Sequence, residues 1–409
     1  MAEIGMSRDE QKRRLRENVI ENNEQGDRKT LSPFAIAVII FLTVAAFAAF
    51  AWFINRESFQ AEYQLLWRLD SAQDEGPSES FKACIPFRKG VVRYTRDGAM
   101  YADNSGRIIW ERSYQMSAPF AAASDDYVVL ADRNGTNAYI FNESENTGTI
   151  STTLPLSQAV VSDQGVVYAV LNDEEAEYIH AYRPDGSVID LSVKSVFTGD
   201  GYPFDLDVSP DGSQLITAYL KLEDEALESH VVFRNFGEVG QNEDARRIVG
   251  GFHEEFVGHM VGKVHFFDNE HSLAVYDGGA AFFSTRVLNR PELTQNVVLD
   301  QKISAVACGK RLAAFLLEKS EDAPAGIRIY SPEGKKLGEV ETELHAEGLE
   351  VSDRFVFLWN RDSLYVYGKD GSLKAELHPE ELFISSAAGV PGSREIILSG
   401  GGSLIKIGF

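Results

Sequence analysis

The sequence predicts an all-β fold, an eight-bladed β-propeller of four-stranded blades, preceded by one transmembrane α-helix. Three observations support this prediction: a long uncharged apolar run near the N-terminus, short β-branched and aromatic runs that recur after it, and Gly- and Asp-rich turns between those runs. The chain has 409 residues and 44% of them are hydrophobic, so it can bury a large core and is not a disordered chain. This length allows two or three domains or one large repeat array.

The apolar run is the predicted membrane anchor. It covers residues 34–54, in which Thr43 is the only polar side chain. A helix of this length spans roughly 31 Å at about 1.5 Å per residue, which matches a hydrocarbon core of about 30 Å. A cleaved signal peptide is the alternative, but the apolar region of such a peptide usually has only about 7–15 residues. We therefore expect an uncleaved signal-anchor that passes the cell membrane once.

Basic residues on the two sides of this run predict the topology. Seven Lys and Arg side chains lie in residues 1–33, whereas two lie in residues 55–74. The positive-inside rule then places the N-terminus in the cytoplasm and the rest of the chain outside it. The predicted organisation is a charged cytoplasmic tail (1–33), the transmembrane helix (34–54), a linker (55–63) and an extracytoplasmic propeller (64–409).

Tight turns that follow a tyrosine mark the repeat. They are Tyr-Arg-Pro-Asp-Gly at 182–186, Tyr-Ser-Pro-Glu-Gly at 330–334 and Tyr-Gly-Lys-Asp-Gly at 367–371. Short strands before and after each turn make a unit of four strands. This template gives seven complete units and an eighth that lacks its fourth strand. Residues 64–409 divide into about 43 residues per unit, the length of a four-stranded blade. Seven blades is the alternative if one divergent unit is miscounted.

The missing fourth strand has a candidate at the other end of the repeat. Leu65-Leu66-Trp67 resembles Ile108-Ile109-Trp110 in the fourth strand of the first unit. Propellers avoid open sheet edges by closing the ring. We therefore expect residues 64–70 to complete the last blade.

Two motifs resemble known repeat families. Ala-Asp-Asn-Ser-Gly-Arg-Ile-Ile-Trp at 102–110 is similar to the repeat of quinoprotein-type propellers, and Val-Ser-Pro-Asp-Gly at 208–212 resembles a turn of bacterial WD40-like propellers. The resemblance implies a propeller, whose relatives include outer-membrane assembly lipoproteins, scaffolds and dehydrogenases. The layout of basic tail, single anchor and external propeller also resembles uncharacterised membrane proteins of clostridia and their relatives. The resemblance of the Ser-Pro-Asp-Gly turn implies a bacterial source.

Histidine offers one candidate metal site. Four of the eight histidines recur every six residues, at His253, His259, His265 and His271. An even spacing places side chains on one face of a strand, and His is a common ligand of zinc and related metals. Glycines and a turn interrupt this stretch, however, so the alternative is that these histidines simply end strands and loops.

Other chemistry is less well supported by the sequence. Asp205, Asp207 and Asp211 suggest calcium, but Asp residues that cap their own turns explain the same pattern. Cys84 and Cys308 fall on the predicted first strands of separate blades, and we expect both to be buried free thiols. The chain lacks a Gly-x-Ser-x-Gly nucleophile elbow and the adjacent Cys pair of quinone-dependent alcohol dehydrogenases. We therefore predict no catalytic residue and no cofactor, with zinc or calcium as the alternatives.

Charge restricts the kind of partner. The tail carries seven acidic and seven basic side chains, so the whole net charge of -23 falls on the external part. A body this acidic does not bind nucleic acid through its net charge. We predict a non-catalytic binding or scaffold module for a protein or cell-envelope partner, bound through the insertions at 223–229 and 237–255. The alternatives are a metal-dependent enzyme or a sugar or peptide binder in the channel, and a sensor that signals through the tail.

Overall fold

The computed structural model describes residues 42–43, 63–70, 83–223, 226–243, 246–379 and 382–409. The chain divides into two compact units, Met1–Glu57 and Ser58–Phe409. The predicted tail and, apart from Leu42 and Thr43, the predicted transmembrane helix lie outside the described residues. Within the described part of the chain, no helix is both long enough and apolar enough to cross a membrane.

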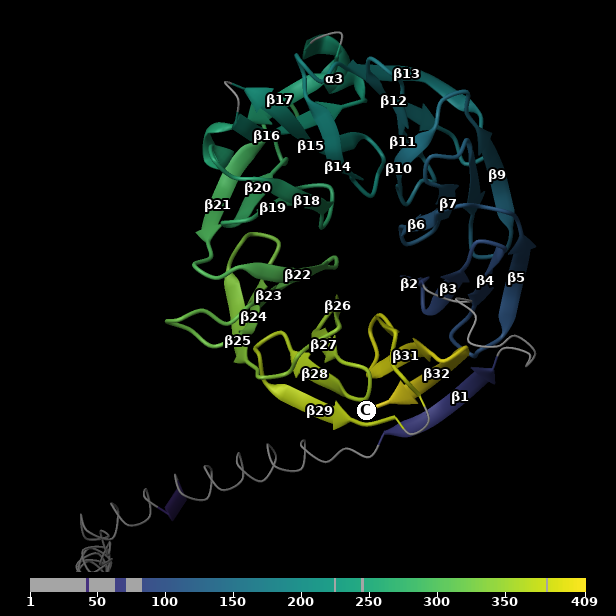
Figure 1. The fold of residues 1–409 in the computed structure, drawn as a ribbon, viewed down its shortest axis with the longest axis vertical. Coiled ribbons are helices and arrows are strands. Elements are labelled where there is room, and N and C mark those ends of the chain that lie inside the picture. Colours follow the sequence, from purple (N-terminus) through teal and green to yellow (C-terminus); the bar gives the residue numbers. More distant parts are fainter. Residues whose placement is uncertain (1–41, 44–62, 71–82, 224–225, 244–245, 380–381) are drawn as a thin grey trace, which may run out of the picture. The chain divides into compact units, whose positions relative to one another are not determined.

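The second unit is a ring of eight four-stranded antiparallel sheets around a central axis (Figure 1). The first four blades contain, from the innermost strand outward, β2 (Ala83–Phe87), β3 (Gly90–Tyr94), β4 (Gly98–Ala102) and β5 (Ile108–Ser113); β6 (Pro119–Ala123), β7 (Val128–Asp132), β8 (Asn137–Phe141) and β9 (Asn146–Ser151); β10 (Leu156–Val161), β11 (Val167–Asn172), β12 (Glu177–Tyr182) and β13 (Val188–Ser195); and β14 (Tyr202–Val208), β15 (Gln214–Glu223), β16 (Ala226–Asn235) and β17 (Ile248–Phe252).

The other four blades continue the same pattern. They contain β18 (Val261–Phe266), β19 (His271–Tyr276), β20 (Gly279–Ser284) and β21 (Glu292–Val298); β22 (Ile303–Cys308), β23 (Ala313–Leu317), β24 (Gly326–Tyr330) and β25 (Lys336–Glu341); β26 (Gly348–Val351), β27 (Phe355–Trp359), β28 (Leu364–Gly368) and β29 (Leu373–Leu377); and β30 (Ser386–Gly389), β31 (Glu395–Gly400) and β32 (Ser403–Gly408), with β1 (Gln64–Asp70) outermost. The fold prediction of eight four-stranded blades is confirmed, and the seven-bladed alternative is wrong.

Strand β1 closes the ring where the sequence predicts a closing strand. It pairs with β32 in the antiparallel sense, from Gln64 opposite Gly408 to Asp70 opposite Ser403. The indole Nε1 of Trp67 donates to the carbonyl of Asn104, 3.0 Å away in the first blade.

The two similar Leu-Leu-Trp and Ile-Ile-Trp segments make equivalent contacts. Trp110 in the first blade donates from Nε1 to the carbonyl of Asn142 in the second blade, at 3.1 Å. Each tryptophan therefore joins the outer strand of one blade to a turn of the next. Gly106 lies directly under the Trp67 ring with φ of +80°, so a side chain at this position would collide with the indole.

Eight apolar clusters fill the eight spaces between neighbouring blades. Strand β7 shows why the inner strands are apolar without interruption: Val128 and Leu130 pack toward the first blade, while Val129 and Ala131 pack toward the third. Successive side chains of a strand point to opposite faces, so a sheet buried on both faces needs apolar residues at every position. Full burial of one Val or Leu side chain stabilises the fold by about 1.5–3 kcal/mol.

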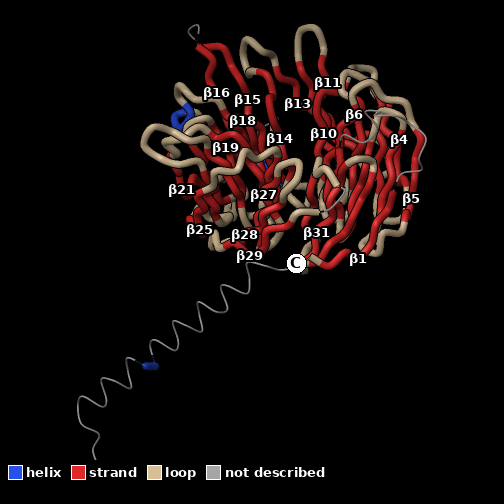
Figure 2. The backbone as a smooth tube through the Cα atoms, turned by 60° about the horizontal axis from the view of Figure 1, so that its bottom comes forward, coloured by secondary structure: helices blue, strands red, loops and turns tan. Residues whose placement is uncertain are grey.

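The two insertions of the fourth blade begin at different ends of its sheet. Glu223 and residues 226–229 belong to the β15–β16 hairpin, because the strands stay paired out to Glu223 and Ala226. The second insertion begins at the opposite end of β16, after Asn235, and forms the short helix α3 (Glu238–Glu243), β17 and the 3-10 helix η2 (Glu254–Phe256). Figure 2 shows the hairpin at the top of the ring and α3 at its side.

Candidate functional site

A cavity of about 460 Å³ lies at one end of the ring. All eight blades line it through the ends of their innermost strands and the turns that follow, so we name this end of the ring the cavity end. The polar groups in its wall include Arg88, Asp125, Asp163, Asp207, His265, Cys308, Lys310, Glu350 and Asp353.

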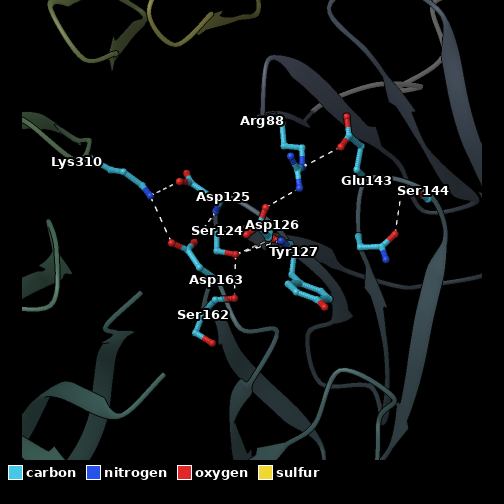
Figure 3. A network of polar contacts seen from close by, with 11 residues as sticks. Arg88, Ser124, Asp125, Asp126, Tyr127, Glu143, Ser144, Ser162, Asp163 and Lys310 are labelled. Carbon is cyan, nitrogen blue, oxygen red and sulfur yellow. Dashed lines mark hydrogen bonds and ion pairs between the residues drawn. The ribbon is translucent and has the colours of Figure 1, made fainter. Parts of the chain in front are cut away.

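One lysine crosses the cavity end. Lys310 follows β22 in the sixth blade, and its ammonium contacts the carboxylates of Asp125 in the second blade and Asp163 in the third, the latter at 3.4 Å (Figure 3). The backbone N–H of Asp125 donates to Asp163 at 2.7 Å and holds the two carboxylates together. Burial lowers the pKa of Lys310, but the hydrogen bond to Asp125 and both negative charges outweigh it, so the net pKa is raised. Opposite sides of the ring are thus joined by an ammonium that stays charged at neutral pH.

Two carboxylates of β14 bind the inner edge of the next blade. Asp205 Oδ2 accepts the backbone N–H of Val264 at 2.7 Å, and Asp207 Oδ2 accepts that of Phe266 at 2.8 Å. Asp207 also lies 3.1 Å from Nδ1 of His265. Both side chains therefore satisfy β18 donors that have no partner strand on this side.

Asp211 is part of its own turn. Its carboxylate accepts hydrogen bonds from the hydroxyl of Ser209 at 2.6 Å and from the N–H of Ser213 at 2.9 Å. The three aspartates that suggest calcium in the sequence thus have protein partners of different kinds.

The fourth to seventh blades place a group of titratable side chains together: Asp205, Lys263, Cys308 and Glu350. Burial raises the pKa of Asp205 to about 6, against the opposing effects of Lys263 and the Val264 N–H. Burial also raises the pKa of Glu350 to about 7, against the Val351 N–H and Lys263. Burial lowers the pKa of Lys263, but Cys308 and the surrounding carboxylates raise it more, so the net pKa is raised. Near neutral pH the group therefore holds one ammonium and carboxyl groups that are partly protonated.

The two thiols are not activated. Cys84 and Cys308 are free cysteines, as predicted, although each is partly rather than fully shielded from solvent. Burial raises the pKa of both thiols to about 12. A nucleophilic cysteine needs a thiolate at neutral pH, so neither side chain is suited to covalent catalysis.

The four histidines singled out by spacing do not share a site. His253 stacks near His230 with ring centroids 5.4 Å apart, whereas His259, His265 and His271 lie beside the carboxylates of Asp277, Asp207 and Asp268. Among the residues that the structure describes, no three His, Cys, Asp or Glu side chains are placed to hold a metal ion together.

Exposed apolar side chains gather at the other end of the ring, which we name the hairpin end because it contains the β15–β16 tip. Sixteen large hydrophobic side chains are exposed among the described residues, and seven of them come from three segments around the fourth blade. These seven are Val196, Phe197, Phe204, Leu222, Leu227, Val257 and Met260. Of these seven, only Leu227 lies within the predicted insertions at 223–229 and 237–255, so the sequence does not single out this group.

Contacts hold these three segments together. The N–H of Val261, which follows the third segment, donates to the hydroxyl of Ser229 in β16 at 2.9 Å. Gly201, at the end of the first segment, adopts φ of +92° where the chain passes close to the carbonyl of Leu220 in β15. The three apolar segments therefore lie next to one another at the hairpin end of the fourth blade.

The architecture defines this protein as an eight-bladed β-propeller in which the N-terminal strand completes the last blade. Residues 59–395 match the family of unknown function DUF5711, and the chain belongs to this family. No curated protein matches the sequence at a significant level.

Among solved structures, BamB from Moraxella catarrhalis shares 10% identity with a TM-score of 0.53, over 85% of this chain and 100% of BamB. The β-propeller domain of Myceliophthora thermophila Cps50 (Swd1) shares 10% identity with a TM-score of 0.46, over 83% of this chain and 99% of that domain. The Neurospora crassa Pan2 WD40 domain shares 10% identity with a TM-score of 0.43, over 71% of this chain and 88% of that domain. The similarity to BamB supports the propeller fold.

Proposed function

We propose that this protein is a membrane-anchored, extracytoplasmic propeller that binds a partner protein and catalyses no reaction itself. The observation that carries this proposal is the clustering of exposed apolar side chains at the hairpin end, where three segments supply seven of them. Monomeric proteins rarely expose large apolar side chains together, and such patches mark protein-protein contacts. Buried apolar anchors supply most of the affinity in such contacts.

The polar groups at the cavity end support a structural rather than a catalytic role. Lys310 is engaged with Asp125 and Asp163, and Asp207 with His265 and a backbone donor. The thiol of Cys308 has a pKa of about 12. A catalytic site needs a nucleophile or base of suitable pKa aimed at open space. Lys310 and Asp207 are instead bound to protein partners, and Glu350, whose pKa burial raises to about 7, accepts the backbone N–H of Val351 at 3.0 Å.

The proposed location rests on the sequence. The apolar run at 34–54 is long enough to span a bilayer, and the basic tail before it favours a cytoplasmic N-terminus. The propeller then lies outside the cytoplasm with its charge of -23. Cell-envelope partners that are basic or neutral suit this charge.

Co-purification from cross-linked membranes tests the proposal. The full-length chain with a C-terminal tag should recover a specific protein, and Phe197→Ser with Leu222→Ser should reduce that recovery at least tenfold. Ile108→Ser with Val188→Ser is the matched control, because both residues are exposed apolar side chains at the starts of outer strands, away from the hairpin end. The control should bind normally. If wild-type protein and both variants recover the same background proteins, the binding function is wrong.

A further inference from the structure

The apolar surface of the hairpin end includes a continuation of the core between the fourth and fifth blades. Alternate residues of the hairpin face the fifth blade and are buried there: Ile216, Ala218, Val231 and Phe233. Leu222 and Leu227 continue this face toward the tip, because side chains alternate along a strand and these two residues are opposite each other in the register. The face of the hairpin that packs against the fifth blade therefore continues beyond the ring, where Leu222 and Leu227 are exposed to solvent.

The connection from the fourth to the fifth blade supplies the other apolar residues. Phe256 is buried in the same core cluster, while Val257 and Met260 on either side of the turn stay 61% and 41% exposed. Leu222 and Leu227 are 50% and 47% exposed. We name these four exposed residues the apolar rim.

Acidic side chains border the apolar rim. Glu254 and Glu255 form η2, immediately before Val257. Asp277 donates its backbone N–H to the carbonyl of Met260 at 3.1 Å, and its exposed carboxylate lies 2.6 Å from Nδ1 of His259. Residues 226–230 and 253–262 contain no Lys or Arg, and residues 219–225 contain one, Lys221, against three acidic residues. The border of the rim therefore carries a net negative charge.

We propose that the apolar rim docks a partner-protein segment that carries apolar side chains flanked by Lys or Arg. The inference rests on the proposed binding function and states where and how the partner is recognised. Apolar side chains of the segment cover the four exposed residues, and its basic residues pair with Glu254, Glu255 and Asp277. A second copy of this chain would bring the same carboxylates together, and an anionic lipid surface would repel them.

Site-specific photo-crosslinking in intact cells tests this inference on the full-length chain. The photoreactive residue p-benzoylphenylalanine replaces Leu222, Leu227 or Val257 in turn. Ile108 and Val188 are matched exposed positions elsewhere, and Phe197 is an exposed apolar position at the same end of the ring but outside the rim. Rim positions should give at least ten times the adduct yield of Ile108 and Val188. The crosslinked peptide, sequenced by mass spectrometry, should contain apolar residues within a Lys- or Arg-rich segment. Glu254→Lys with Glu255→Lys should lower the yield about fivefold or more.

The outcomes separate this inference from the proposed function. Adducts at Phe197 but not at the rim would overturn the rim as the docking site and leave the binding function standing. Adducts to a second copy, to lipid or to an acidic segment would overturn the stated partner chemistry. If no position gave an adduct and membrane co-purification recovered no partner, both proposals would fail.

Discussion

Asp205 and Asp207 illustrate how single carboxylates join neighbouring blades. Each accepts a backbone N–H of β18, and Lys310 extends the same kind of polar contact across the whole ring. Spacing in the sequence singles out the two aspartates, but their partners lie far along the chain and only the closed ring brings them close. Lys310 and Glu350 belong to no motif, so the sequence could not single them out.

Glu350 should make stability depend on pH. Burial raises its pKa from 4.5 to about 7 in the folded state, so between these values the folded protein binds more protons than the unfolded chain. The free energy of unfolding should therefore fall as pH rises through this window and level off above it. In urea titrations from pH 4.5 to 8, Glu350→Gln should reduce that fall and stabilise the protein above pH 7 by ~1–3 kcal/mol. Parallel pH profiles for wild type and variant would contradict this assignment.

The two thiols should resist modification in the folded protein. With pKa values raised to about 12 by burial, Cys84 and Cys308 hold a negligible thiolate fraction at pH 8. Ellman's reagent should therefore label both residues at least a hundredfold more slowly than after denaturation in guanidinium chloride. Rapid labelling of Cys308 in native protein would show an accessible thiolate and would contradict the conclusion that this residue is unsuited to covalent catalysis.

Whole strands and turns were largely predictable, and the exceptions have a physical reason. Strands buried on both faces appear in the sequence as short apolar runs, and Gly-containing turns separate them. This pattern is enough to predict the four-stranded blades. The β15–β16 hairpin was the exception, because its tip contains acidic residues that also suit a helical turn or a loop. Only pairing with the opposite strand, which sequence periodicity does not reveal, extends β15 to Glu223.

The closing strand should be essential to the stability of the ring. Trp67 packs over Gly106 and donates to Asn104, which joins the last blade to the first. Trp67→Ala should lower the free energy of unfolding by about 2–4 kcal/mol in urea titrations, because it removes a large packed side chain at the junction. Leu65→Ala on the same strand, whose side chain is half exposed, should change it by less than about 0.5 kcal/mol. Equal losses of unfolding free energy for the two variants would indicate that backbone pairing between β1 and β32, rather than the Trp67 side chain, stabilises the closure.

The whole molecule combines a closed ring, which the structure describes, with an anchor that rests on the apolar run in the sequence. Eight interblade clusters and one closing strand make the ring complete within Ser58–Phe409. One end of this ring carries the polar cavity, and the other carries the seven exposed apolar residues around the fourth blade. This separation favours a module that stays rigid at its centre and binds through its hairpin end.

Membrane attachment should depend on residues 34–54 alone. The full-length chain should stay in the membrane pellet after extraction at pH 11, because an apolar helix of this length remains in the bilayer when peripheral contacts are lost. A chain without residues 34–54 should move to the supernatant. Release of the full-length chain at pH 11 would rule out the transmembrane anchor.

Hydrogen exchange on the complex with its captured partner tests the central claim most directly, because it reports which end of the ring the partner covers. The partner should slow exchange in the tip of the β15–β16 hairpin and in residues 253–261, and should leave the cavity-end turns around Asp125 and Lys310 unchanged. Protection confined to those cavity-end turns, with the hairpin unaffected, would contradict the account.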